Sequence, residues 1–242
     1  VINSSFGKFG NKYSTLYSPK LLIQTTITGQ LMLLMLIERF NAIPGVQVVS
    51  ANTDGVVVSI HKDSIQDVAL AELLWSMDTN MNLERSEYSK LMSLNVNNYV
   101  AVMKDSNKVK LKGAFSNAKL AKNPDRRIVY SSIAKFLATG IPVEQTINEC
   151  NDITQFLLSR KVAGGALYEG AEVGKFVRYY YSNSAPEDSY IEYKTNGNRV
   201  PNSLKAKPLI HLSDGNLNDV DKERYIQEAI ELIEFVAVGL DR

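Results

Sequence analysis

The chain has 242 residues, of which 45% are hydrophobic and 22% are charged, the composition of an ordinary globular protein with one large domain or two smaller ones. Its 27 basic and 26 acidic residues nearly cancel, so net charge selects no class of partner and only the distribution of charge can indicate one. One cysteine and two histidines exclude an internal disulfide framework and a multi-cysteine zinc site, so we expect any metal to be held by carboxylates.

The N-terminal region predicts one long helix after a short one. Residues 1–19 indicate the end of a helix and a loop, and residues 21–40 predict a buried helix because their apolar pattern is too long for a strand. Glycine disfavours a helix interior, so we expect a close packing contact at Gly29. The longest uninterrupted apolar run, residues 31–37, is shorter than a membrane span, and we therefore expect no membrane partner.

Residues 46–60 have the composition of a β-hairpin. Two β-branched runs flank Asn52, Thr53, Asp54 and Gly55, which together predict a tight turn. Asp54 would then lie at the tip of two rigid strands, where a carboxylate can bind a divalent cation such as Mg²⁺. An ordinary hairpin turn contains the same residue types, and the turn by itself favours that simpler interpretation.

The rest of the chain predicts a change of character near residue 114. We expect an α+β fold, in which an antiparallel sheet with packed helices occupies residues 1–114 and a mostly helical domain occupies residues 115–242. The expected helices are residues 64–76, 127–138, 143–160 and 221–236, and the expected strands are residues 83–95, 99–103 and 108–114.

Positive charge gathers around that boundary. Residues 104–127 contain eight lysines and arginines against two aspartates, a pattern typical of phosphate binding that a solvated surface would explain equally well. Lys110 and Lys112 would share one face of a strand and reach one phosphate backbone, with Gly113 ending the strand; the simpler interpretation is a strand edge protected by lysine. The basic residues are Lys104, Lys108, Lys110, Lys112, Lys119, Lys122, Arg126 and Arg127.

Two further segments have residue types suited to nucleic acid. Residues 3–7 read NSSFG, in which Asn3 can bond a sugar or phosphate, Phe6 can pack on a base and Gly7 allows close approach. A helix end with a packed phenylalanine is the simpler interpretation. Arg178 precedes three tyrosines and is a candidate contact to a nucleic-acid backbone, whereas the tyrosines themselves are more typical of packing.

The order and spacing of these motifs resemble the C-terminal half of the catalytic core of family B DNA polymerases, particularly those of bacteriophages. That family carries Asn-Ser-x-Tyr-Gly on a helix, here residues 3–7, and then a helix with a Thr-x-x-Gly-Arg-like start, here residues 25–30. A hairpin with Tyr-x-Asp-Thr-Asp-Ser at its tip follows, here residues 50–55. A Lys-x-Lys-Gly element at the palm–thumb junction matches residues 110–113. The resemblance covers about the first half of the chain and weakens beyond it.

The resemblance implies a palm-type sheet with its catalytic hairpin, followed by a thumb. The implied reaction is attack of a primer 3′-hydroxyl on the α-phosphate of a dNTP, with two Mg²⁺ ions stabilising the attacking and leaving oxygens. The implied partners are primer–template DNA and dNTP. The implied site residues are Asp54 for catalysis and metal binding, Asn3, Phe6 and Gly7 for the nucleotide, and Lys110, Lys112, Gly113 and Arg178 for DNA.

The chain departs from the family pattern in five respects. Asn52 stands in place of the first hairpin aspartate, Phe6 in place of tyrosine and Gly55 in place of serine. The family's triphosphate-binding lysine and its first metal-binding aspartate have no counterpart here. We therefore expect a fragment of a longer polymerase that is inactive alone, needs the upstream part of the same polymerase as a partner, and works in the cytoplasm, that of the host cell if it is viral.

Two other functions fit the same residues. A non-catalytic nucleic-acid-binding module is the main alternative, because Asn52 cannot supply the charge of an aspartate. The hairpin would then bind no metal, and only the basic stretch would bind nucleic acid. A reverse-transcriptase-like palm also places a carboxylate at a hairpin tip, but the Asn-Ser-x-aromatic-Gly block of residues 3–7 argues against it.

Overall fold

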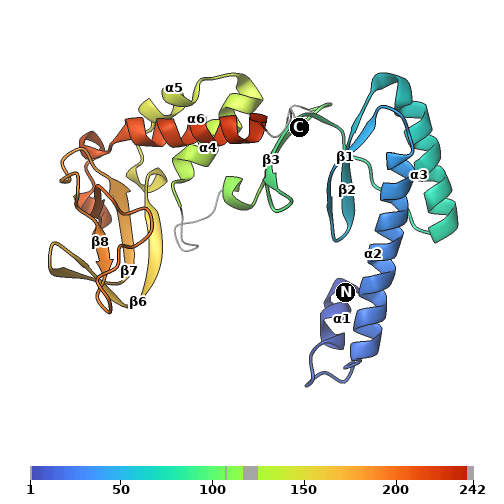
Figure 1. Ribbon diagram of the computed structural model, residues 1–242, viewed down its shortest axis with the longest axis horizontal. Coiled ribbons are helices and arrows are strands. Elements are labelled where there is room, and N and C mark those ends of the chain that lie inside the picture. The colour runs from blue at the N-terminus through green and yellow to red at the C-terminus, as the bar shows by residue number, and fades with distance from the viewer. Residues whose placement is uncertain (1, 107, 117–124, 239–242) are drawn as a thin grey trace. The chain divides into compact units, whose positions relative to one another are not determined.

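The computed structural model describes residues 2–106, 108–116 and 125–238, and among these the side chains of residues 6–106, 108–116 and 125–236. The fold is α+β with antiparallel sheets, which confirms the expected class. The chain divides into two compact units, Val1–Arg85 and Ser86–Arg242, and each is described by itself (Figure 1). The domain boundary expected at residue 114 falls inside the second unit.

Unit 1 is organised around the long helix α2 (Pro19–Asn41). Its start follows the usual capping chemistry, because the Ser18 side chain accepts a hydrogen bond from the backbone N–H of Leu21 and Pro19 occupies the first turn. The short helix α1 (Ile2–Phe9) packs at this end of α2, where the N–H of Ser18 donates to the carbonyl of Phe9 at 3.0 Å. Both expected N-terminal helices are therefore present.

The hairpin and α3 pack on the other end of α2. Strands β1 (Val46–Asn52) and β2 (Gly55–Ile60) pair antiparallel as expected, and α3 (Ile65–Thr79) follows them. The Trp75 indole N–H of α3 donates to the carbonyl of Met32 on α2 at 2.7 Å, which satisfies the polar atom of a buried ring. The buried core of this unit is Leu36, Phe40, Val68, Ala71 and Trp75.

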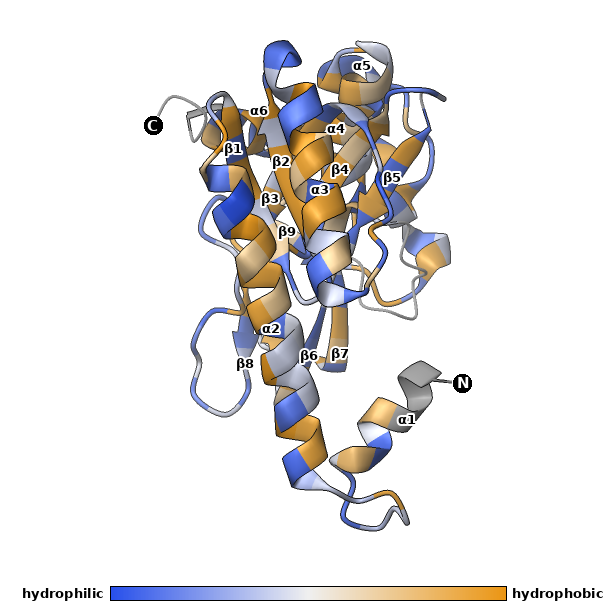
Figure 2. Ribbon diagram, turned by 90° about the vertical axis from the view of Figure 1, so that its right-hand side faces the viewer, coloured by the Kyte–Doolittle hydropathy of each residue, from blue (hydrophilic) through white to orange (hydrophobic). Residues whose placement is uncertain are grey.

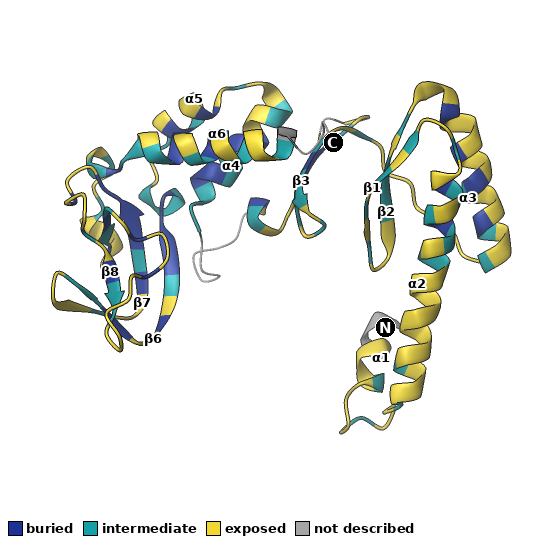
Figure 3. Ribbon diagram, viewed as in Figure 1, coloured by how far each residue is buried: buried dark blue, intermediate teal, exposed yellow. Residues whose placement is uncertain are grey.

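Helix α2 is far more exposed than its sequence predicts. Of its described side chains, Leu36 and Phe40 are buried, and most of the N-terminal half is open to solvent (Figure 3). No described atom lies within 4 Å of a methyl group built on Gly29, so the close contact expected there is wrong. An all-round apolar pattern predicts burial, but α3 and the hairpin cover only the C-terminal half of the helix.

Apolar side chains therefore lie on the open side of both helices of unit 1. Figure 2 colours the ribbon by hydropathy and shows many hydrophobic residues along α2 and α3. Within the described residues, α2 is the one helix long and apolar enough to cross a membrane by length and composition, which the short run of residues 31–37 did not indicate. The exposed apolar residues of the two helices include Leu21, Ile23, Ile27, Leu31, Leu34, Leu70, Leu73, Leu74 and Met77.

Unit 2 begins with a three-stranded antiparallel sheet in the order β3-β4-β5. Its strands are β3 (Tyr88–Asn95), β4 (Asn98–Met103) and β5 (Val109–Lys112), close to the three that the sequence predicts. One face of this sheet, through Val100 and Leu111, joins the main hydrophobic core of the unit. The other face carries Lys110 and Lys112 together with Tyr99, Leu91 and the buried Ala101.

The C-terminal region is not mainly helical, and this expectation is wrong. Only α4 (Arg127–Thr139), the short α5 (Val143–Asn148) and α6 (Lys222–Val238) are α-helices in its described part. The helix expected over residues 143–160 ends at Asn148. Between α5 and α6 lies a curled four-stranded half-barrel in the order β8-β6-β7-β9. Its strands are β6 (Leu158–Tyr168), β7 (Ala171–Tyr181), β8 (Ile191–Tyr193) and β9 (Ala206–Pro208).

Glycines explain why the sequence pattern of β6 and β7 does not predict two ordinary strands. Gly164, Gly165 and Gly174 have φ values of +83°, +97° and +93°, which side chains rarely adopt. The β6–β7 register shifts in this same stretch, so the strands bend and the sheet curls. The apolar alternation that would reveal a strand is interrupted at the bend. Short 3₁₀ helices occupy Lys62–Ser64, Gly113–Phe115, Ile153–Gln155, Leu212–Asp214 and Leu217–Asp219.

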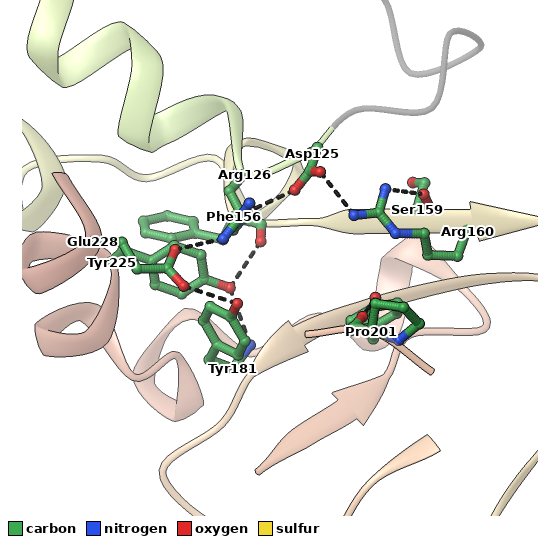
Figure 4. A network of polar contacts seen from close by, with 10 residues as sticks. Asp125, Arg126, Phe156, Ser159, Arg160, Tyr181, Pro201, Tyr225 and Glu228 are labelled. Atoms are coloured by element: carbon green, nitrogen blue, oxygen red, sulfur yellow. Dashed lines mark hydrogen bonds and ion pairs between the residues drawn. The ribbon is translucent and has the colours of Figure 1, made fainter. Parts of the chain in front are cut away.

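A buried polar network holds the half-barrel to α6 and to the start of α4 (Figure 4). Arg126 forms an ion pair with Glu228 at 3.0 Å, and the other oxygen of Glu228 accepts from the Tyr181 hydroxyl at 2.9 Å. The fully buried Tyr225 hydroxyl accepts from the N–H of Tyr181 at 3.0 Å and donates to the carbonyl of Phe156 at 2.8 Å. Because each of these contacts pairs a donor with an acceptor, burial of this network costs little.

Candidate functional site

The hairpin of unit 1 presents Asp54 to solvent. The pair Asn52 and Gly55 closes the hairpin, which leaves Thr53 and Asp54 as a two-residue turn. The Asn52 side-chain oxygen accepts from the N–H of Thr53 at 2.7 Å and from its hydroxyl at 3.1 Å. Asp54 is exposed and, among the described residues, makes no hydrogen bond or ion pair. Asn52 therefore stabilises the turn, and the Asp54 carboxylate is left available to an outside ligand.

A complete metal site is not present in the described part of the chain. No group of three or more His, Cys, Asp and Glu side chains there could hold a metal ion. Mg²⁺ is usually held by one or two carboxylates together with waters and substrate phosphates. The chemistry of Asp54 thus fits one ligand of such an ion, and the remaining ligands would have to come from phosphates and from other residues.

The N-terminal motif lies on α1. Phe6 is 39% exposed, and a methyl group built on Gly7 would meet no described atom within 4 Å, so both positions are open to an external group. Asn3 is helical, and its side chain lies outside the described part. No hydrogen bond or ion pair among the described residues joins α1 to the hairpin tip. These positions are compatible with the implied nucleotide contacts, which stay a prediction.

Lys110 and Lys112 lie on the face of the β3-β4-β5 sheet that does not join the core. Lys112 pairs with Tyr99 in register, and its ammonium group is 5.7 Å from the centre of that ring. The pKa of Lys110 is raised above its ordinary value, chiefly by the nearby Tyr88 hydroxyl and further by Tyr99, while burial acts in the opposite direction. The result is a face with two charged amines beside two phenol rings, which we call the lysine–tyrosine face (Tyr88, Tyr99, Lys110 and Lys112).

Sequence reasoning found the two lysines and missed the two tyrosines. Strand alternation places residues i and i+2 on one face, which is why Lys110 and Lys112 could be paired in advance. Tyr88 and Tyr99 come from two other strands, so their position depends on the antiparallel register. Lysines next to aromatic rings are suited to bind phosphates and to contact sugars or bases.

Gly113 has a structural function at the end of β5. Its φ is +63°, and a methyl group there would lie 2.2 Å from the carbonyl oxygen of Asn97. The next residue, Ala114, donates its N–H to the side-chain oxygen of Asn98 at 2.8 Å. Glycine is therefore required where the chain leaves β5 beneath the β3–β4 turn, and it fixes the direction in which the lysine strand ends.

The basic stretch around residue 114 is only partly free to bind an anion. Arg126 forms ion pairs with Asp125 and Glu228, and Lys104 pairs with Glu87 at 2.8 Å. Lys119 and Lys122 lie outside the described residues. The local excess of positive charge therefore overstates the number of cations available to DNA. Lys110 and Lys112 are two cations that share one face of the sheet.

Arg178 lies on β7 in the half-barrel. Its guanidinium is 5.2 Å from the centre of the Phe176 ring, and its buried Nε has no hydrogen-bond partner. The three following tyrosines, at 179–181, are all buried, so their side chains pack in the interior, as expected. Arg178 is thus the residue of this stretch that remains open to a ligand.

A cavity in unit 2 is lined by none of the predicted site residues. It has a volume of about 730 Å³ and lies beside Tyr180, Lys207 and the loop before α6. Asp219 is one of the residues that line it and accepts hydrogen bonds from Ser182, Ser184 and Tyr180. These hydrogen bonds lower the pKa of Asp219 against the opposing effect of burial. The cluster is satisfied internally and holds the loop to the sheet.

The chain was compared with known proteins. No protein-family model matches it, and no curated protein matches it.

Proposed function

We propose that this chain forms the C-terminal part of the palm and the thumb of a DNA-dependent DNA polymerase of the family B type. The observation that carries the proposal is the exposed Asp54 carboxylate at a two-residue hairpin tip, held by two paired strands and unpartnered among the described residues. The order of motifs around it supports the same assignment. The reaction would be transfer of a nucleotide from dNTP to a primer 3′-hydroxyl.

In this proposal each unit has a separate task. Asp54 would hold Mg²⁺, which when bound stabilises charge on the attacking and leaving oxygens. Phe6 and Gly7 would contact the nucleotide, with Asn3 beside them. The lysine–tyrosine face would bind the primer–template backbone through charge and without sequence preference.

The exposed apolar sides of α2 and α3 support the expectation of a further polymerase segment. Buried apolar surface contributes about 25 cal/mol per Å², so a covering segment would stabilise unit 1 considerably. The second metal-binding carboxylate would come from that segment too. The polymerase would then act in the cytoplasm, that of the host cell if it is viral, without a membrane partner.

Asp54→Asn tests the proposal because it keeps the size of the side chain and removes its charge. We expect primer extension by the longest natural chain that contains these residues to fall by about 10³-fold or more, since metal-assisted charge stabilisation supplies several kcal/mol. Binding of a primer–template duplex should change less than about twofold, because one exposed charge contributes little to it. A gel assay of labelled primer and an anisotropy titration give the two readouts.

Asp63→Asn is the matched control. Asp63 is also an exposed aspartate of unit 1, and it faces His61 at 3.3 Å rather than the hairpin tip. It should leave extension unchanged. If Asp54→Asn extends primers as well as Asp63→Asn does, Asp54 is not the metal ligand.

The alternative is a nucleic-acid-binding module without catalysis. It is favoured by the lack of an acidic cluster in the described residues and by the engagement of Asn52 within its own turn. In that case no natural chain containing these residues extends primers, while duplex binding still depends on Lys110 and Lys112.

A further inference from the structure

The outer face of the half-barrel carries a second cluster suited to an anion. Register pairs Ser159 with Arg178 and Lys161 with Phe176 across β6 and β7. Opposite residues of an antiparallel pair lie on one face of the sheet, so these four side chains share it. We call them the arginine–phenylalanine face. The residues between them, Arg160 and Val177, lie on the other face, where Val177 joins the core.

Two polar groups on this face are unsatisfied. Ser159 is 1% exposed and its hydroxyl has no hydrogen-bond partner, and the same holds for the buried Nε of Arg178 beside it. Neither Arg178 nor Lys161 forms an ion pair with a described carboxylate. A buried guanidinium Nε–H without an acceptor is costly, and an anion that accepts from it would remove that cost.

The chemistry of this face favours a phosphodiester over a carboxylate ligand. Arg178 and Lys161 lie on diagonal positions of neighbouring strands, two register positions apart, and neither forms an ion pair with a described carboxylate. The Phe176 ring is 40% exposed and lies 5.2 Å from the guanidinium, so an aromatic surface adjoins the cations. Cations beside an open aromatic ring are typical of proteins that bind single strands, where a base can stack on the ring.

We infer that the outer face of the half-barrel is a binding site for single-stranded nucleic acid, in which Arg178 and Lys161 hold a phosphate and Phe176 stacks an unpaired base. This inference rests on the proposed function because it takes the ligand to be nucleic acid. It goes beyond that function because the ligand is a single strand and not the primer–template duplex. A duplex keeps its bases stacked inside, so Phe176 would contribute nothing to binding it.

The test measures binding by the purified 242-residue chain with fluorescence anisotropy. Three labelled probes are used: a 12-nucleotide oligothymidylate, an abasic strand of the same length, and a hairpin duplex. Arg178→Gln should weaken binding of both single strands about tenfold, because hydrogen bonds to an ionised group are the strong ones. Phe176→Leu should lower the ratio of the affinity for the oligothymidylate to that for the abasic strand by about fivefold. It should leave duplex binding unchanged.

Lys175→Gln is the matched control for charge. Lys175 is an exposed cation on the same strand, next to Phe176, and alternation places it on the opposite face. It should weaken binding of the single strands less than about twofold. Thermal unfolding followed by circular dichroism verifies that all variants fold.

Three outcomes with a chain that binds single strands would overturn the inference. They are an equal effect of Arg178→Gln and Lys175→Gln, a preference for bases that survives Phe176→Leu, and displacement of the strand by inorganic phosphate or pyrophosphate as readily as by an abasic competitor. A chain that binds no single strand overturns it as well.

The two proposals fail separately. Lys110→Gln with Lys112→Gln should weaken duplex binding and leave the preference for bases intact, so it reports on the lysine–tyrosine face. Survival of primer extension in Asp54→Asn would remove the polymerase assignment without touching the effects of Arg178 and Phe176 on single strands.

Discussion

The two units of this chain differ in how completely they bury their apolar residues. Unit 2 joins a three-stranded sheet, three helices and a half-barrel around one core, and its polar groups are tied together through Glu228, Tyr181 and Tyr225. Unit 1 packs a hairpin and α3 on one half of α2 and leaves leucines and isoleucines of both helices in solvent. The unit with the candidate catalytic carboxylate is therefore the less self-sufficient one.

This difference explains where ligands and partners can act. The apolar core of unit 2 is covered by its own residues, and the candidate ligand-binding groups of this unit lie on sheet faces that do not join that core. In unit 1, Asp54 and the open sides of α2 and α3 both lack a described partner. We interpret unit 1 as a part that gains stability when a further segment or ligand covers it.

Phe156→Ala should have the largest effect and would break the self-sufficiency of unit 2. Phe156 is fully buried and packs edge-to-face on Tyr225, with ring centres 5.2 Å apart. Removing a buried aromatic ring costs about 3–5 kcal/mol through lost burial and the cavity left behind. Urea unfolding followed by circular dichroism measures the loss. Phe235→Ala, at a residue 73% exposed, should change it by less than about 0.5 kcal/mol; similar effects of the two substitutions would contradict the assigned core.

Alkaline pH should weaken unit 2 through its buried tyrosines. Burial raises the pKa of Tyr179 to about 12, and its hydroxyl donates to the carbonyl of Pro201 at 2.6 Å. In the unfolded chain a tyrosine ionises near about 10. The folded state therefore holds its proton longer, so this stabilisation is full below about pH 10 and falls by about 2–3 kcal/mol as pH rises to 12. Tyr179→Phe should flatten the fall, measured by urea titrations at each pH, whereas the exposed Tyr190→Phe should not.

Gly29→Ala should have the smallest effect, and it should raise the free energy of unfolding rather than lower it. It tests whether α2 is exposed to solvent at this position. No described atom would meet the new methyl group, and alanine is favoured over glycine in a helix by about 1 kcal/mol. Unfolding followed through Trp75, the single tryptophan, which bonds to α2, should shift toward higher urea.

Gly140→Ala is the contrasting control for that change. Gly140 ends α4 with a φ of +77°, a conformation that alanine adopts only with strain, so the same substitution should destabilise unit 2 by about 1 kcal/mol. A destabilised Gly29→Ala variant would instead mean that α2 is packed at Gly29.

Local sequence patterns were sufficient to predict each helix or strand whose apolar residues recur at one regular spacing. The helical spacing of apolar residues predicted α2, α3, α4 and α6, and β-branched runs around Asn52 and Asp54 predicted the hairpin. Alternation also placed Lys110 and Lys112 on one face. These features depend on neighbours along the chain, so they can be read from it without knowing the fold.

Tertiary structure decided whatever depends on residues distant in sequence. The half-barrel escaped prediction because glycines at 164, 165 and 174 bend its strands and interrupt their alternation. The same is true of the burial of α2, since an apolar helix surface looks alike whether a neighbour covers it or not. Tyr88 and Tyr99 meet Lys110, and Ser159 meets Arg178, only through cross-strand register, which no local pattern encodes.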